Sequence, residues 1–204
     1  MKKIAIVAFL LAVGAVAGRA QESRQDVSIS GTALVMPFIA GTNDIDVHSS
    51  YGLGILASYR FMLTPSSALE ANYSIDYQNK YHYDEPNFPQ GGIRVPARTQ
   101  EISAAYVRSF NFKKFNPFAE AGPAAVIYVP IRNSGLGDIN AKQQTAVGGM
   151  YGAGVAYEIS PSFDIRAEYR GLVTKVPSFG DAGVLSPNKW FNIFMPTIGV
   201  AYHF

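Results

Sequence analysis

Large apolar residues alternate with small or polar residues along much of this 204-residue chain. The alternation is cleanest over residues 51–63, 69–77, 151–159 and 163–171. A period of two is typical of β-strands, and no window gives a convincing helical period of 3.6. Segments near 99–110 and 116–129 alternate less cleanly, one near 27–38 is the weakest, and 191–204 is the eighth candidate. Together these segments predict an all-β fold of about eight strands.

The predicted connections between the strands alternate in length. Short connections lie at 64–67, 111–115 and 160–162, and long ones near 39–50, 79–98, 130–145 and 175–190. Short turns on one side and long loops on the other are typical of an antiparallel up-and-down transmembrane β-barrel. In such a barrel the short turns and both chain ends lie on the periplasmic side.

The face opposite the large apolar residues combines charges with glycine, alanine and serine. Its charged residues are Arg60, Glu70, Asp76, Glu101, Glu120, Glu158, Asp164, Arg166, Glu168 and Arg170. In a secreted soluble barrel these charges would face solvent, and the tyrosines would fill the interior. In a membrane barrel they would fill the lumen, and the tyrosines would face lipid. The signal for export at residues 1–20, the tyrosine-rich apolar face and the apolar carboxy-terminus together favour the membrane barrel.

The first twenty residues have the pattern of a secretory signal peptide. Lys2 and Lys3 precede an apolar run over 4–17, and small residues follow up to Ala20. The run is shorter than the roughly 20 residues that span a bilayer. We therefore expect residues 1–20 to be removed after Ala20, or alternatively after Ala17, and residues 21–204 to form one outer-membrane barrel domain.

Removal of the signal peptide changes the charge balance. Without Lys2, Lys3 and Arg19, the 17 basic residues fall to 14, against 15 acidic ones. The mature chain therefore gives no reason to expect a nucleic-acid partner. The sequence contains no cysteine, which excludes a disulfide framework.

The last segment ends on alternating apolar residues, Ile198, Val200, Tyr202 and Phe204, and residues 116–122 read NPFAEAG. Both resemble the small eight-stranded bacterial outer-membrane barrels typified by the OmpA transmembrane domain and the opacity-type proteins. The resemblance implies a cell-surface protein of the Gram-negative envelope, surrounded by outer-membrane lipid and lipopolysaccharide. It also implies that Val200, Tyr202 and Phe204 form the assembly signal read by the barrel-assembly machinery. We expect a monomer.

The hairpin turns predict ion pairs inside the barrel. A turn centred on Pro65 places Arg60 opposite Glu70, and one centred on Ser162 places Glu158 opposite Arg166. Glycines over 148–154 would leave room for long charged side chains. An eight-stranded interior is just wide enough for side chains to fill it, so we expect a plugged lumen. The predicted lumen charge network comprises Arg60, Glu70, Glu120, Glu158, Arg166, Glu168 and Arg170.

Outside the lumen, the long segment 79–98 is the main candidate for an external contact. It contains Tyr81, Tyr83 and Phe88 among charges of both signs, which is typical of a binding patch. A solvated loop with its aromatic residues at the level of the lipopolysaccharide explains the same residues.

An enzyme is the less favoured interpretation. His48 and Ser50 have the spacing of a lipid A-modifying pair, but they share the lumen face, and no acidic residue follows at a useful distance. Three scattered histidines predict no metal site, and we predict no catalytic residue and no cofactor. The sequence favours a structural or surface-interaction role, in adhesion or ligand contact, through the extracellular loops. A lipid A-modifying enzyme and a small passive channel stay as alternatives, and the extracellular ligand is not identified.

Overall fold

The computed structural model describes residues 24–40, 46–49, 51–84, 93–131, 141–180 and 189–204. The predicted signal peptide, residues 1–20, lies outside these residues, as do Ser50 and Phe88. Among the residues described, none forms a helix long and apolar enough to span a bilayer.

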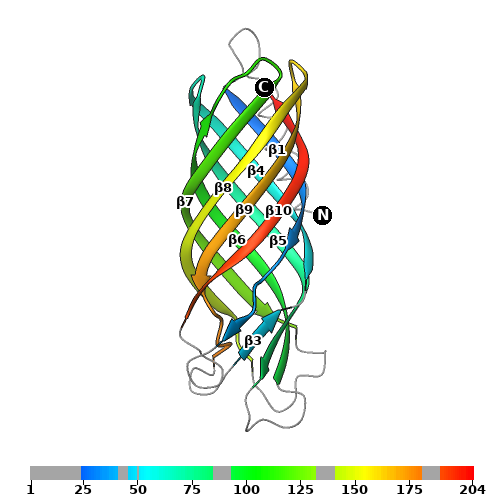
Figure 1. Ribbon diagram of the computed structural model, residues 1–204, viewed down its shortest axis with the longest axis vertical. Helices are drawn as coiled ribbons and strands as arrows, with labels where there is room; N and C mark the ends of the chain where they lie inside the picture. The colour runs from blue at the N-terminus through cyan, green and yellow to red at the C-terminus, as the bar shows by residue number, and fades with distance from the viewer. Residues whose placement is uncertain (1–23, 41–45, 50, 85–92, 132–140, 181–188) are drawn as a thin grey trace, which may run out of the picture.

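The structure is an antiparallel β-barrel (Figure 1). Eight long strands form its wall, which confirms the predicted fold. Two short strands, β2 and β3, lie beyond one end of the wall. The strands are β1 (Gln25–Leu34), β2 (Ile39–Ala40), β3 (Asp46–Ser49), β4 (Gly52–Thr64), β5 (Ser67–Asp84), β6 (Ile93–Ser109), β7 (Phe115–Pro130), β8 (Gln144–Ser160), β9 (Phe163–Lys175) and β10 (Trp190–His203).

The barrel closes between its first and last long strands. β1 pairs with β10 from Asp26↔His203 to Thr32↔Thr197, and with β4 on its other side. Closure leaves no strand edge in the wall. An open edge in lipid would leave backbone groups without hydrogen bonds, at a cost of several kcal/mol each.

The two ends of the barrel differ. At one end the strands join through the short turns near residues 65, 113 and 161, as the sequence predicts. At the other end β5 and β6 continue to Asp84 and from Ile93, and β3 pairs with β5 at Val47↔Tyr83. Most of the expected loop 79–98 is therefore strand. Short turns are periplasmic in bacterial barrels, so β3 and the ends of β5 and β6 lie on the extracellular side.

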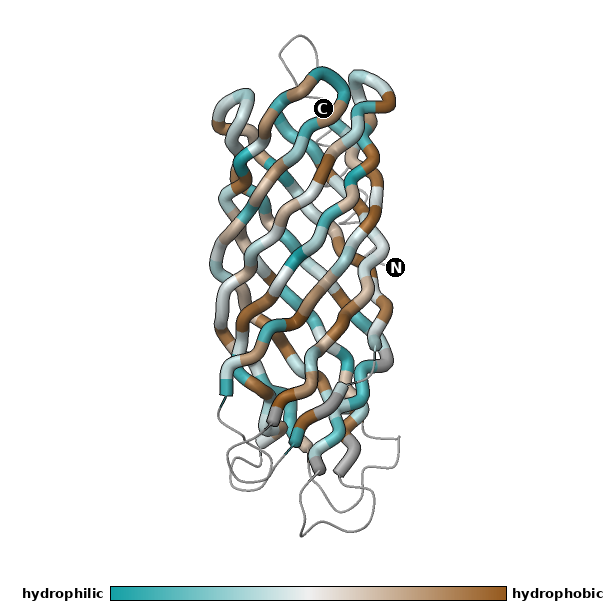
Figure 2. The backbone as a smooth tube through the Cα atoms, viewed as in Figure 1, coloured by the Kyte–Doolittle hydropathy of each residue, from teal (hydrophilic) through white to brown (hydrophobic). Residues whose placement is uncertain are grey.

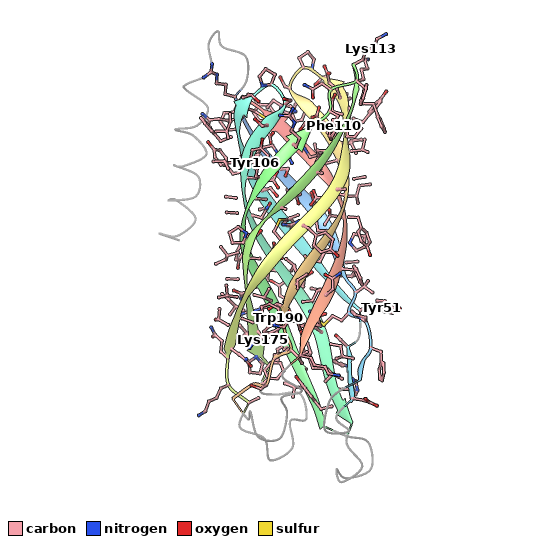
Figure 3. The ribbon with its side chains drawn as sticks, turned by 60° about the vertical axis from the view of Figure 1, so that its left-hand side comes forward. Tyr51, Tyr106, Phe110, Lys113, Lys175 and Trp190 are labelled. Carbon is pink, nitrogen blue, oxygen red and sulfur yellow. The ribbon has the colours of Figure 1, made fainter. Side chains whose placement is uncertain are left out.

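Apolar side chains cover the outside of the wall. Hydropathy alternates along the strands in Figure 2. Aromatic residues lie near both ends of the outer surface: Tyr51 and Trp190 toward the extracellular end, Tyr106 and Phe110 toward the periplasmic end (Figure 3). Such belts mark the two membrane interfaces.

Candidate functional site

The periplasmic half of the interior is built around one buried arginine. The guanidinium of Arg170 on β9 lies 3.0 Å from a carboxylate oxygen of Glu101 on β6 and 3.2 Å from one of Glu120 on β7. A carboxylate oxygen of Glu168 is 2.9 Å away. The Arg170 side chain is fully buried. Three strands of the wall are thus connected through one side chain inside the barrel.

A glycine on β8, which has no side chain, leaves room for this cluster. A Cβ atom added at Gly152 would lie 2.9 Å from Glu120 Oε1 and 3.4 Å from Arg170 Cγ. The expectation that glycines of this strand leave room for long charged side chains is therefore confirmed at Gly152.

Two further pairs lie closer to the periplasmic turns. Arg60 donates a 2.6 Å hydrogen bond from Nε to Glu70 Oε2, and its guanidinium lies 4.8 Å from the centre of the Phe118 ring. Arg166 donates a 2.8 Å hydrogen bond to Asp26 on β1. The Arg60–Glu70 pairing is the one expected from the Pro65 turn.

The expected pairing of Glu158 with Arg166 is wrong. Glu158 lies opposite Asp164, and Arg166 lies opposite Ala156. The turn sets Ser160 opposite Phe163, one residue away from a turn centred on Ser162, and the register shift between Glu158 and Ser160 moves the partner by one more residue. Glu158 is half-buried in this position.

Sequence reasoning missed several members of the interior clusters. Asp26 immediately precedes the irregular segment near 27–38, and Glu101 is on the predicted polar face but is not a member of the predicted network. His203 is one of the three scattered histidines of the sequence, and its Nε2 lies 2.8 Å from Asp164 Oδ2. In the sequence, only the position of Glu101 on the inner face indicates that it belongs to an interior cluster.

The extracellular half of the interior is apolar and aromatic. The Phe179 ring lies between three tyrosines, with ring centres 5.5 Å from Tyr81, 6.5 Å from Tyr83 and 6.4 Å from Tyr128. All four side chains are about 1% exposed or less. Leucine, valine, isoleucine and methionine side chains from the surrounding strands complete this aromatic layer.

Tyr81 and Tyr83 therefore do not present their rings outside the barrel, contrary to the expected loop contact. The register of β5 with β6 shifts between Asp76 and Asn79. This irregularity reverses the alternation, so Tyr77 faces outward while Tyr81 and Tyr83 face inward. The third residue of that prediction, Phe88, lies outside the described residues.

The segment 176–180, which follows β9, holds Phe179 in place. Gln144 Oε1 accepts hydrogen bonds from the backbone N–H groups of Ser178, at 2.6 Å, and Phe179, at 3.0 Å. The Tyr83 hydroxyl donates to the carbonyl of Pro177 at 2.7 Å. Phe179 has a φ of 49°, an uncommon conformation for a bulky residue. We call this segment the stopper segment, because it folds into the extracellular mouth of the barrel.

Comparison with known proteins agrees with this architecture. The family model described as outer membrane protein beta-barrel domain matches residues 5–204. The chain belongs to this outer-membrane β-barrel family. This barrel protein is accordingly located in the cell outer membrane.

Solved structures resemble this outer-membrane barrel at low sequence identity. Neisserial surface protein A is 15% identical, with 89% of this chain and 98% of that one covered and a TM-score of 0.60. OprG from Pseudomonas aeruginosa is 12% identical, with coverage of 91% and 98% and a TM-score of 0.64. Ail of Yersinia pestis, in complex with the heparin analogue sucrose octasulfate, is 13% identical, with coverage of 89% and 99% and a TM-score of 0.50. No curated protein sequence matches.

The predicted assembly-signal residues end the closing strand of the barrel. Val200 and Tyr202 face outward on β10, and the Tyr202 ring lies 5.1 Å from that of Phe163 and 6.0 Å from that of Phe204. The backbone N–H of Phe204 donates to the Gln25 carbonyl at 3.0 Å, so Phe204 continues the pairing with the start of the barrel.

Of the histidine and serine considered for lipid A chemistry, His48 lies at the extracellular end of the barrel. His48 belongs to β3 and is paired with His82 on β5, whereas Ser50 is outside the described residues. Within the described ranges, histidine and acidic side chains form no group of three that could hold a metal ion.

Proposed function

We propose that this outer-membrane barrel has a structural and surface-interaction role, in adhesion or ligand contact, through its extracellular end. The observation that carries the proposal is the filled interior. Arg170 with its carboxylates and Phe179 with its tyrosines form two layers in series across the lumen. Because the lumen is filled, a specific interaction has to use the outer surface and the loops. A filled lumen also argues against a passive channel.

The extracellular end has the architecture for such a contact. β3 extends the sheet beside β5, beyond the wall of the barrel (Figure 1). The same end carries the connections between β5 and β6 and between β7 and β8. A rigid scaffold that positions variable loops is a common arrangement for binding. Ail, the attachment invasion locus protein of Yersinia pestis, has a related fold and has been solved in complex with a heparin analogue.

A binding experiment with a matched loop variant tests the proposal. Cells displaying the protein are measured for retention on immobilised heparin and on surfaces coated with extracellular matrix. The variant replaces residues 85–92 with a glycine–serine linker, and its folding is checked by gel mobility before and after boiling. We expect retention above that of cells without the protein, and loss of retention in the folded variant.

A chemical measurement separates the enzyme alternative. Lipid A mass spectra from cells with and without the protein should be identical under this proposal. A new lipid A species that depends on the protein would contradict it.

A further inference from the structure

The hairpin between β6 and β7 differs from the other periplasmic turns. Phe112 and Phe115 exchange backbone hydrogen bonds of 3.3 and 2.9 Å, which makes Lys113 and Lys114 the two central residues of a tight turn. Lys113 has a φ of 55°. A positive φ at the first central position of a two-residue hairpin normally calls for glycine. Lys113 therefore has a backbone conformation that favours a residue without a side chain, and such strain often marks a functional position.

The strand that enters this turn carries an arginine on the membrane-facing side. Tyr106 and Arg108 lie on the outward face of β6, Phe110 and Phe112 follow at the same spacing beyond its end at Ser109, and all four are exposed. Figure 3 shows Tyr106, Phe110 and Lys113 toward this end of the barrel. Aromatic rings at this height lie at the level of the lipid headgroups. Arg108, between two of the rings, therefore faces headgroups.

The other two periplasmic turns carry no charge. Their sequences are Thr-Pro-Ser-Ser at 64–67 and Ser-Pro-Ser-Phe at 160–163. Lys113 and Lys114 thus place two positive charges on one of the three periplasmic turns, and Arg108 lies on the strand that enters this turn. We call residues 106–115 the cationic hairpin.

The cationic hairpin is held in place by its neighbours. Asn111 donates a 2.9 Å hydrogen bond to the carbonyl of Pro65 in the adjacent turn. On the other side, the backbone N–H of Glu158 donates to the Lys114 carbonyl at 2.9 Å. Because the hairpin is already fixed by these bonds, binding of a ligand costs it less conformational entropy.

We propose that the cationic hairpin binds the phosphate headgroup of an anionic phospholipid in the periplasmic leaflet. The guanidinium of Arg108 can donate two parallel hydrogen bonds to phosphate oxygens, and Lys113 and Lys114 add positive charge at the turn. Phe110 and Phe112 lie beside this site, at the level of the headgroups. This inference does not depend on the proposed extracellular role.

The single tryptophan of the chain provides a reporter and a control. Trp190 lies near the opposite end of the barrel, beside Lys175, whose Nζ is 5.9 Å from the ring centre. Combining Trp190→Phe with Phe110→Trp moves the only indole next to Arg108. The protein is then folded into phosphatidylcholine vesicles that contain either brominated phosphatidylglycerol or brominated phosphatidylcholine, and quenching of the indole reports which lipid lies beside it.

We expect phosphatidylglycerol to be preferred at position 110. Each of Arg108→Gln, Lys113→Gln and Lys114→Gln should lower this preference up to about fivefold, because one cation near an anionic surface contributes about that factor. Lys175→Gln, at the other end, should leave it unchanged. Equal quenching by the two lipids at position 110, or a preference that survives all three substitutions together, would overturn the proposal.

Native mass spectrometry supplies a second measurement that needs no tryptophan exchange. The wild-type barrel should retain phosphatidylglycerol after release from mixed micelles, and the triple glutamine variant should lose it. Equal retention by the two proteins would also overturn the proposal.

Discussion

Arg170 shows how one side chain can hold distant parts of a barrel together. Its guanidinium contacts carboxylates on β6, β7 and β9, and it is fully buried. Burying charges is costly, and mutual pairing offsets much of that cost. Removing one partner therefore does more harm than the loss of one contact, because the remaining charges stay buried.

The first prediction removes the positive charge from this cluster. Arg170→Met should lower the free energy of unfolding by about 3–5 kcal/mol, since it leaves the surrounding carboxylates without their counter-charge. Urea unfolding in lipid vesicles measures the change. Glu158→Gln is the control, since Glu158 is half-buried opposite another acid. Its effect should stay within about 0.5 kcal/mol, and an Arg170→Met barrel as stable as wild type would refute the ionic cluster.

A second prediction fills the space beside the same cluster. Gly152→Val should displace Glu120 and destabilise the barrel by about 1–3 kcal/mol, because the new side chain would overlap that carboxylate. Gly31→Ala is the matched control, since its new methyl group would lie 3.9 Å from the nearest atom, the carbonyl oxygen of Ile198. Equal stabilities of the two variants would show that Glu120 has room to move.

Among the elements, the stopper segment depends on one glutamine of the neighbouring strand. Gln144 Oε1 accepts from two backbone N–H groups and, at 3.3 Å, from the Ser178 hydroxyl. Such a segment can open without unfolding of the barrel wall, because local and global stability are separable.

The third prediction concerns that local opening. Gln144→Ala should speed hydrogen exchange at the amides of Ser178 and Phe179, because two buried donors lose their acceptor at about 1–3 kcal/mol each. The amide of Ile193, inside β10, provides the control and should keep its protection. Unchanged exchange at Phe179 would mean that the aromatic packing alone holds the segment.

The closing strand is the other element whose terminus matters. Deleting Phe204 should leave export intact but reduce insertion, since it removes both the bond to Gln25 and the residue that matches the assembly signal. Outer-membrane fractionation and the mobility shift on boiling measure this, with Phe204→Tyr as the control that keeps an aromatic end. A normal folded band from the deletion would contradict the prediction.

For the molecule as a whole, the two interior layers act in series. Wild type should give no steady current in planar bilayers. Phe179→Ala should also give none, because Arg170 and its carboxylates still fill the lumen below the opened mouth. Reproducible single-channel currents from wild type would favour the passive channel.

Whether a contact can be predicted from the sequence depends on how far apart its two residues lie along the chain. The alternation and the short turns are local, so the strands, the barrel and the Arg60–Glu70 pair follow from them. Arg166 and Asp26 are 140 residues apart, and Arg170 meets Glu101 across two intervening strands. Such contacts depend on strand tilt and stagger, which no local spacing encodes. The inward direction of Tyr81 and Tyr83 depends on one irregularity near residue 77 that the alternation does not reveal.

The ion pairs that cross the lumen also affect how each strand is aligned with its neighbours along the barrel. Sliding a strand by two residues keeps its apolar side chains toward the membrane, so lipid discriminates poorly between such alignments. The same slip moves Arg170 by about 7 Å relative to the wall, at about 3.4 Å per residue, which is far enough to separate it from Glu101 and Glu120. Lipid thus selects which face of a strand points outward, and the buried charges select one alignment among those that lipid tolerates.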